Sequence, residues 1–247
     1  MSPAAYAEMA ATQESHWWFA ARRGILRSRL ERLQLPAGAD ILEIGSGTGA
    51  NLDLLAEFGR VVGLEMSREA IDFAGQRPYS RSGAVTMRLG RCPEDLSGLP
   101  QFDLVCMFDV LEHIEDDCAS LAAAASHLKP GGRLLLTVPS YQWMWGPHDE
   151  HLHHKRRYSR QSIADRCVQA GLALHHLSHF NTLLFPLAVA GRLYEKAAGR
   201  STAAAATPAA PINTVLRCTF ALERHLLSRM RLPFGLSLLA VAGPMEH

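Results

Sequence analysis

The chain has 247 residues, with 25 basic and 24 acidic side chains and a net charge of +1. This length suits one large domain with a full core, and the charge balance argues against nucleic acid or another bulk polyanion as the main partner. The sequence contains neither a stretch of about 18 uncharged apolar residues nor a basic N-terminal leader with an apolar run, so we expect a cytoplasmic protein without a spanning helix.

Residues 1–35 are predicted to form a helical cap at the N-terminus. Apolar side chains recur at helical spacing from Trp17 to Leu33, and a Pro-Ala-Gly sequence at residues 36–38 interrupts the pattern. Short apolar runs replace the helical periodicity beyond this break. The core domain is therefore expected to start at residue 36.

Residues 36–180 alternate between short apolar runs and helical segments. Such alternation predicts an α/β fold, in which a doubly wound, Rossmann-like sheet carries helices on both faces. Later apolar runs bring the predicted sheet to seven strands. The predicted strands are residues 40–45, 60–65, 84–89, 103–108, 133–138, 172–180 and 235–243.

Residues 181–234 form a predicted helical insertion before the last strand, and residues 235–247 hold that strand and the tail. The insertion contains two apolar helices, at 183–198 and 214–230, and an Ala/Thr/Pro tract at 201–211 that we expect to be a flexible linker. Two interpretations of the helices stay open. They can pack on each other and on the sheet edge, or expose an apolar face to a lipid-like substrate, a membrane surface or a second subunit.

The turn after the first strand carries the most specific motif. It reads Glu43-x-Gly45-x-Gly47-x-Gly49 and leads into a helix. Glycines at such a turn let the backbone approach a ligand and present amides to it. A dinucleotide fingerprint is GxGxxG, so the early third glycine indicates a ligand without a pyrophosphate. Glu65, at the end of the second strand, is placed to accept both hydroxyls of a ribose.

These residues resemble the class I S-adenosylmethionine-dependent methyltransferases, in particular the group related to the quinone-biosynthesis (type 11) methyltransferases. The resemblance runs from about residue 14 to residue 178 and implies a seven-stranded sheet whose last strand is antiparallel. Four further stretches carry it: HWWFAARRGIL (16–26), FDLVCMFDVLEHIED (102–116), LKPGGRLLLTVP (128–139) and HDEHLHHKRRYSRQSI (148–163).

The resemblance implies S-adenosylmethionine as the cofactor. The glycine turn would hold its methionine and ribose, Glu65 its ribose hydroxyls and Met66 its adenine. Separately from the resemblance, Trp17 and Trp18 lie with Arg22 and Arg23 on one predicted helix, and they are either core aromatics or part of a lid from which an arginine faces the cofactor carboxylate. The family often has Gly-Asp-Ala after the third strand, but this chain has Gly-Arg-Cys at 90–92. The adenine contacts must then come from backbone or from other side chains nearby. The expected cofactor-binding residues are Glu43, Gly45, Ser46, Gly47, Gly49, Glu65, Met66, Cys92, Phe108, Asp109, Trp18 and Arg22.

Residues 146–159, GPHDEHLHHKRRYS, gather four histidines, two carboxylates and a Lys-Arg-Arg run. A metal site would need converging ligands, which this spacing does not enforce, so no metal is expected. A nucleic-acid patch lacks a wider basic stripe. Because ligands of doubly wound sheets lie beyond the carboxyl ends of the strands, the segment is expected to line the acceptor site. His148 or His151, oriented by Asp149, is the expected catalytic base.

The Glu112-His113 pair after the fourth strand is interpreted as a brace for its loop rather than as a catalytic pair. The predicted function is methyl transfer to a small-molecule acceptor, with O-methylation of an amphipathic or lipid-like metabolite favoured. N- or C-methylation stays open. The alternatives from other classes are a nucleotide-cofactor oxidoreductase and a catalytically silent binding protein. Contact with a membrane, or a homodimer, is expected to use the insertion at 181–234.

Overall fold

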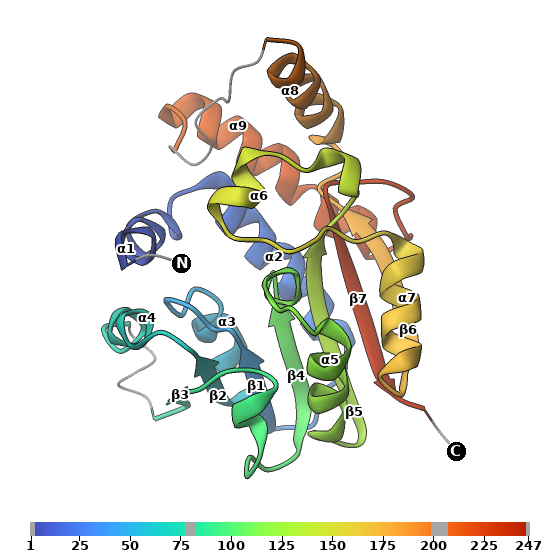
Figure 1. Cartoon of the computed structure of the whole chain (residues 1–247). Helices are drawn as coiled ribbons and strands as arrows, with labels where there is room; N and C mark the ends of the chain where they lie inside the picture. The colour runs from blue at the N-terminus through green and yellow to red at the C-terminus, as the bar shows by residue number, and fades with distance from the viewer. Residues whose placement is uncertain (1–2, 78–82, 199–206, 246–247) are drawn as a thin grey trace.

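The computed structural model describes residues 3–77, 83–198 and 207–245. A seven-stranded sheet with the order β3-β2-β1-β4-β5-β7-β6 forms its centre (Figure 1). The strands β1 to β5 pair in parallel, and β7 lies antiparallel between β5 and β6. The predicted fold and the antiparallel last strand are confirmed. The strands are β1 (Ala39–Ile44), β2 (Gly59–Glu65), β3 (Val85–Leu89), β4 (Phe102–Phe108), β5 (Leu128–Pro139), β6 (Leu172–Phe180) and β7 (Ser237–Pro244).

Helices cover both faces of this sheet because its central strands are apolar along nearly their whole length. One core cluster joins the sheet to α5 and α7, and the second joins the opposite face to α2, α3, α9 and α10. The α-helices are α1 (Pro3–Thr12), α2 (Trp17–Arg32), α3 (Leu52–Ala56), α4 (Arg68–Ala74), α5 (Asp117–Ser126), α6 (Pro147–His151), α7 (Arg160–Gln169), α8 (Phe185–Ala198), α9 (Ala210–Ala221) and α10 (Glu223–Leu227). The described residues also form the 3₁₀ turns η2 (Glu94–Leu96), η3 (Leu111–His113) and η4 (Gln142–Met144).

The N-terminal cap consists of two helices, α1 and α2. The chain bends between α1 and α2, where the His16 side chain accepts a hydrogen bond from the Trp18 backbone N–H and caps α2. Helix α2 buries Ile25, Leu26 and Leu30 against the sheet. Helix α1 packs against α4, on the side of the sheet where β2 ends (Figure 1).

The insertion differs from the predicted pair of helices. The first runs over Phe185–Ala198 as α8, but the second is divided into α9 and α10 at Leu222. Directly after the division lies Glu223, whose buried carboxylate accepts a hydrogen bond from the Leu183 backbone N–H. Helix α9 packs on α2, and its Phe220 stacks on Phe180 of β6. Of the predicted linker, residues 201–206 lie outside the described residues, and α9 starts within its C-terminal end.

No helix among the described residues has both the length and the apolar character needed to cross a membrane.

Candidate active site

The glycine turn between β1 and α3 has the shape that its sequence indicates. Gly45, Gly47 and Gly49 all have positive φ angles, of 70°, 54° and 81°. A Cβ atom on Gly45 would lie 2.5 Å from Cγ2 of Val110. A side chain is therefore excluded at Gly45 both by backbone conformation and by the close approach of the segment that follows β4.

Glu65 lies at the end of β2 directly opposite this turn. Its Oε2 accepts a hydrogen bond from the Gly47 backbone N–H at 2.8 Å, and its Oε1 accepts one from the Ser67 N–H at 2.9 Å. The hydroxyl of Tyr6, on α1, donates to the same Oε1 at 3.4 Å. The carboxylate is only 4% exposed, so α1 covers the position that the sequence analysis assigns to a ribose.

Asp109 and Arg22 form an ion pair at the carboxyl end of β4. Asp109 has a φ angle of 55°, a strained conformation that is common at functional sites. Arg22, buried on α2, also donates to Oγ1 of Thr137 on β5 at 3.0 Å. Its guanidinium carbon lies 4.9 Å from the ring centroid of Trp18 and 5.5 Å from that of Phe108. Arg22, Trp18, Phe108 and Asp109 are four of the expected cofactor-binding residues, and they thus lie together. Arg22 has a carboxylate partner within the chain.

The remaining cofactor candidates are less closely grouped. The buried Glu43 accepts a hydrogen bond from Asn51 at 2.9 Å, and burial raises the pKa of Glu43 to about 8. Met66 is 57% exposed at the end of β2. The Cys92 thiol packs against α5 and donates to the Ser120 carbonyl, and burial raises its pKa to about 11. Asp95 accepts the Arg91 backbone N–H. The adenine contacts therefore stay predictions.

Asp149, on α6, is the fully buried centre of the histidine-rich segment. Its Oδ1 lies 2.9 Å from Nδ1 of His154 and 2.7 Å from Nε of Arg157, and its Oδ2 accepts the Gly146 N–H. Burial opposes ionisation of this carboxyl, but the hydrogen bonds from His154 and Arg157 outweigh it and hold its pKa well below the usual range.

The structure thus corrects the expected pairing of Asp149 with His148 or His151. Both of those histidines have exposed side chains. The reason is local: His153 adopts a left-handed conformation with φ 57°, and the chain turns back so that the His154 N–H donates to the Asp149 carbonyl at 2.9 Å. The imidazole of His154 is thereby brought over the Asp149 carboxylate.

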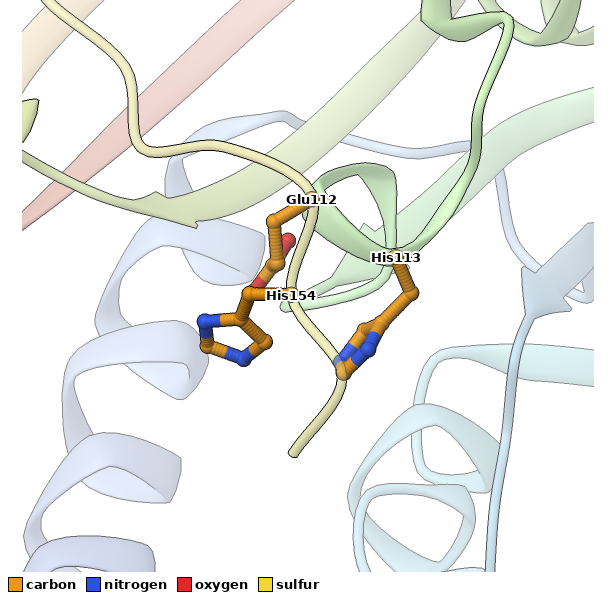
Figure 2. A group of neighbouring side chains, drawn as sticks. All are labelled: Glu112, His113 and His154. Atoms are coloured by element: carbon orange, nitrogen blue, oxygen red, sulfur yellow. The ribbon is translucent and has the colours of Figure 1, made fainter. Parts of the chain in front are cut away.

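His154 faces Glu112 and His113 of η3, as Figure 2 shows. Each of the three residues offers one atom that could bind a metal ion, and these atoms lie within 4.8 Å of one another. Among the described residues, this is the group that could hold a metal ion. The Glu112 carboxylate is 1% exposed, and neither of its oxygens has a hydrogen-bond partner in another described residue. Burial, and then the charge of Asp109, raise the pKa of Glu112 well above its usual value. Burial, and then His154, lower the pKa of His113 to about 4.

This arrangement defines what His154 can do chemically. An ionised Asp149 accepts the Nδ1–H of His154, which fixes the tautomer and leaves Nε2 as a free acceptor. Nε2 can then take a proton from a bound hydroxyl. Proximity of the three residues also permits a divalent cation, although the sequence analysis expects none. The pair Glu112-His113 lies beside His154, and the Glu112 carbonyl accepts the Lys155 N–H at 2.7 Å, so its interpretation as a brace stays a prediction.

A family profile described as a methyltransferase domain matches residues 18–177. The chain belongs to the class I S-adenosylmethionine-dependent methyltransferases. A ubiquinone biosynthesis O-methyltransferase from Xanthomonas axonopodis pv. citri is 34% identical over 106 residues, which cover 42% of this chain and 44% of that protein. The match spans less than half the length of the relative. The family, and with it S-adenosylmethionine as the cofactor, is nevertheless in agreement with the sequence analysis.

Solved structures show the same fold for this methyltransferase. A Haloferax volcanii methyltransferase in complex with the Trm112 methyltransferase activator has a TM-score of 0.62 at 22% identity, over 99% of this chain and 96% of that chain. The [4+2]-cyclase SpnF has a TM-score of 0.59 at 19% identity, over 93% of this chain and 83% of that chain. Because one of these neighbours is a cyclase by name, the reaction must be argued from the site and not from the fold.

Sequence reasoning missed two residues of this methyltransferase. Tyr6 on α1 carried no signal, because a lone tyrosine outside any motif does not reveal which carboxylate it will reach. His154 was one of four histidines with no distinguishing spacing. The one available signal was the Lys-Arg-Arg run, whose third member, Arg157, shares the Asp149 carboxylate with His154.

Proposed function

We propose that the protein transfers the methyl group of S-adenosylmethionine to a hydroxyl of a small, partly apolar acceptor. The observation that supports this most is the Asp149–His154 pair, which lies beside the buried carboxyl of Glu112 at the carboxyl end of the sheet. A hydroxyl needs a base as it becomes a nucleophile, and a histidine oriented by a carboxylate is suited to that role.

The residues at the ends of β1 and β2 fit the proposed cofactor. Space is open at Gly47, where a Cβ would meet no atom within 4 Å, and the ribose hydroxyls would bind to Glu65 in place of Tyr6. Arg22 and Asp109 would bind the amino-acid part, since they offer one charge of each sign. When bound, S-adenosylmethionine supplies an electrophilic methyl group on a sulfonium, so the protein has only to align and deprotonate the acceptor.

Electrostatics favours His154 as the group that receives the proton. Burial opposes a charge on Glu112 and on His113, because it raises the pKa of the first well above its usual value and lowers the pKa of the second to about 4. No carboxylate in the described part of the chain is hydrogen-bonded to the His113 ring to offset a positive charge there. A positive charge on His154 is offset by Asp149, which is bonded to its Nδ1. The proton is therefore expected to pass to Nε2 of His154, while Arg157 keeps Asp149 in place.

An aromatic group at the start of the segment that follows β5, the segment that also carries His154, supports a partly apolar acceptor. Tyr141 and Trp143 of the segment after β5 lie near Phe185 of α8, with ring centroids 5.6 Å and 6.3 Å from it. Trp143 is 49% exposed, so its ring is available to a ligand. The similarity to a ubiquinone biosynthesis O-methyltransferase favours oxygen over nitrogen or carbon as the acceptor atom.

The experiment is methyl transfer from isotopically labelled S-adenosylmethionine into a metabolite extract, with the labelled product analysed by mass spectrometry and NMR. We expect a labelled methoxy group on an extractable small molecule. A labelled N-methyl or C-methyl product would contradict the hydroxyl acceptor and leave methyl transfer standing. Cofactor binding without transfer to any fraction would favour the silent binding protein. Elemental analysis of the same preparation tests for a cation at Glu112, His113 and His154.

A further inference from the structure

Exposed apolar side chains are concentrated in the insertion. Among the described residues, nine of the fourteen large hydrophobic side chains that are exposed lie between residues 183 and 234. Single exposed hydrophobic residues are normal on a protein surface, but a concentration of this kind marks an interaction site. The nine are Leu183, Leu187, Leu193, Tyr194, Ile212, Val215, Leu222, Met230 and Phe234.

Helix α8 is turned with its apolar side outward and its ion pair inward. Leu187 and Tyr194 are each 64% exposed, and seven residues apart they lie on one helical face. Arg192 and Glu195 pair with each other on the other side, with side chains 12% and 16% exposed. The Arg192 guanidinium packs so closely on Gly146 that a Cβ there would meet it at 1.8 Å. A surface helix that only faces water would instead expose its charged side chains and bury its apolar ones.

The orientation of α8 is fixed by contacts with the segment that follows β5. Phe185, at the start of α8, lies 5.6 Å from the ring of Phe234 and 6.3 Å from that of Trp143. Near the other end of α8, Lys196 Nζ donates to the Trp143 carbonyl at 3.0 Å. Figure 1 shows α8 beyond α6, at the end of the molecule to which the strands point their carboxyl ends. The outward apolar face is therefore close to the proposed acceptor site.

The exposed charges of the insertion are basic. Arg217, Arg224, Arg229 and Arg231 are exposed on α9, α10 and the turn that follows. The two carboxylates in the described residues of the insertion are both engaged: Glu195 with Arg192, and Glu223, buried, with the Leu183 N–H. A surface that carries both apolar side chains and arginines is suited to an anionic bilayer. The apolar side chains can enter the boundary between headgroups and acyl chains, and the arginines can bind the lipid phosphates. A two-fold contact between copies would instead bring arginines together.

We propose that α8, α9 and α10 form a membrane-docking surface for anionic phospholipid bilayers. Leu187, Leu193 and Tyr194 insert at the level of the headgroups, and the arginines bind lipid phosphates. This inference does not depend on the proposed reaction. If the proposed methyl transfer also holds, docking through this surface places the acceptor site near the bilayer. A lipid-like acceptor can then enter the site without crossing water.

The test is sedimentation of the full chain with vesicles of phosphatidylcholine alone and of phosphatidylcholine mixed with phosphatidylglycerol. Wild-type protein should bind the anionic vesicles and be released by salt. Leu187→Glu should weaken this binding by at least about tenfold, because it puts a charge where apolar area is buried. Arg217→Gln should weaken it by about fivefold. Val168→Glu is the control, since Val168 is 61% exposed on α7 and outside the insertion.

Failure of the wild type to bind anionic vesicles would overturn the proposal, as would equal losses in Leu187→Glu and Val168→Glu. Light scattering is measured on the same samples. A dimer that Leu187→Glu dissociates, with no vesicle binding by either protein, would assign this face to a second copy instead. Circular dichroism of each variant before the assay ensures that a loss of binding is not a loss of folding.

Discussion

The cofactor side and the acceptor side of this methyltransferase are built in different ways. On the cofactor side, the turn after β1 and Glu65 at the end of β2 are joined by backbone amides within a few residues of two neighbouring strands. On the acceptor side, His154 and Asp149 come from the segment after β5, and Glu112 comes from η3 after β4. The first depends on local chain geometry, and the second on how a long loop folds over the sheet.

The carboxylates of the two sides also differ in how many hydrogen-bond or ion-pair partners they have. Glu65 and Asp109 have several partners or an ion pair, whereas neither oxygen of Glu112 has a partner in another described residue. A buried carboxyl without partners destabilises a fold unless it stays protonated or binds something. Among the described residues, Glu43 on the cofactor side keeps one hydrogen bond, from Asn51, although its Oε2 has none, whereas Glu112 on the acceptor side has no partner for either oxygen. We expect the acceptor side to be completed when the acceptor binds.

The largest expected effect is on stability, for Asp149→Asn. Removing one member of a buried ion pair leaves Arg157 uncompensated and costs about 3–5 kcal/mol. Denaturant unfolding measures this loss. The matched control is Glu57→Gln, which breaks the exposed ion pair with Arg27 and should cost only about 0.2–1 kcal/mol. Equal losses of unfolding free energy in the two variants would mean that the ion pair of Asp149 with Arg157 does not hold the segment after β5 in place.

On the cofactor side, Glu65→Ala should weaken the binding of S-adenosylmethionine by about 1.5–3 kcal/mol, the scale of hydrogen bonds to a charged group. Isothermal calorimetry checks it. Glu69→Ala serves as the control, because Glu69 is exposed on α4 and accepts a hydrogen bond from the neighbouring Ser67 hydroxyl rather than from the turn at Gly47. An unchanged affinity in Glu65→Ala would remove the ribose assignment.

The pH dependence of stability tests the buried carboxyl of Glu43. Burial raises its folded-state pKa from 4.5 to about 8, so the stability that it contributes is complete below pH 4.5 and is lost as the pH rises through 8. Glu43→Gln cannot ionise and escapes this loss. The melting temperature of the variant, relative to wild type, should rise by several degrees between pH 5 and pH 8, at about 2–4 °C per kcal/mol. A pH-independent difference would place the carboxyl in a more polar environment.

The smallest expected effect concerns the contact between α1 and the cofactor side. Tyr6→Phe removes a donor that occupies Glu65, so the affinity for S-adenosylmethionine should rise by up to about fivefold, a modest effect because the hydrogen bond to the carboxylate is long, at 3.4 Å. Tyr194→Phe is the control, since Tyr194 is 64% exposed on α8. Weaker cofactor binding in Tyr6→Phe would mean that this hydroxyl contacts the cofactor rather than competing with it.

The difference between the two sides explains how far the sequence could predict them. The strands and the turn at Gly45 were predictable, because apolar periodicity and glycine spacing reflect local backbone requirements. The partner of Asp149 was not, because it depends on one left-handed residue, His153, that nothing in the sequence distinguishes from its neighbours. The contact with Leu183 of Glu223, which directly follows the division of α9 from α10, was not predictable either, because the two residues are distant in the sequence.

The central claim is that His154 is the base on the acceptor side, and single-turnover methyl transfer by His154→Asn and His151→Asn tests it most directly. With the identified acceptor and saturating S-adenosylmethionine, the account predicts that His154→Asn slows transfer by about 100-fold or more, as expected for loss of a general base. His151→Asn should keep nearly the wild-type rate, and both variants should bind the cofactor as wild type does. A full rate in His154→Asn, or a loss confined to His151→Asn, would contradict the account.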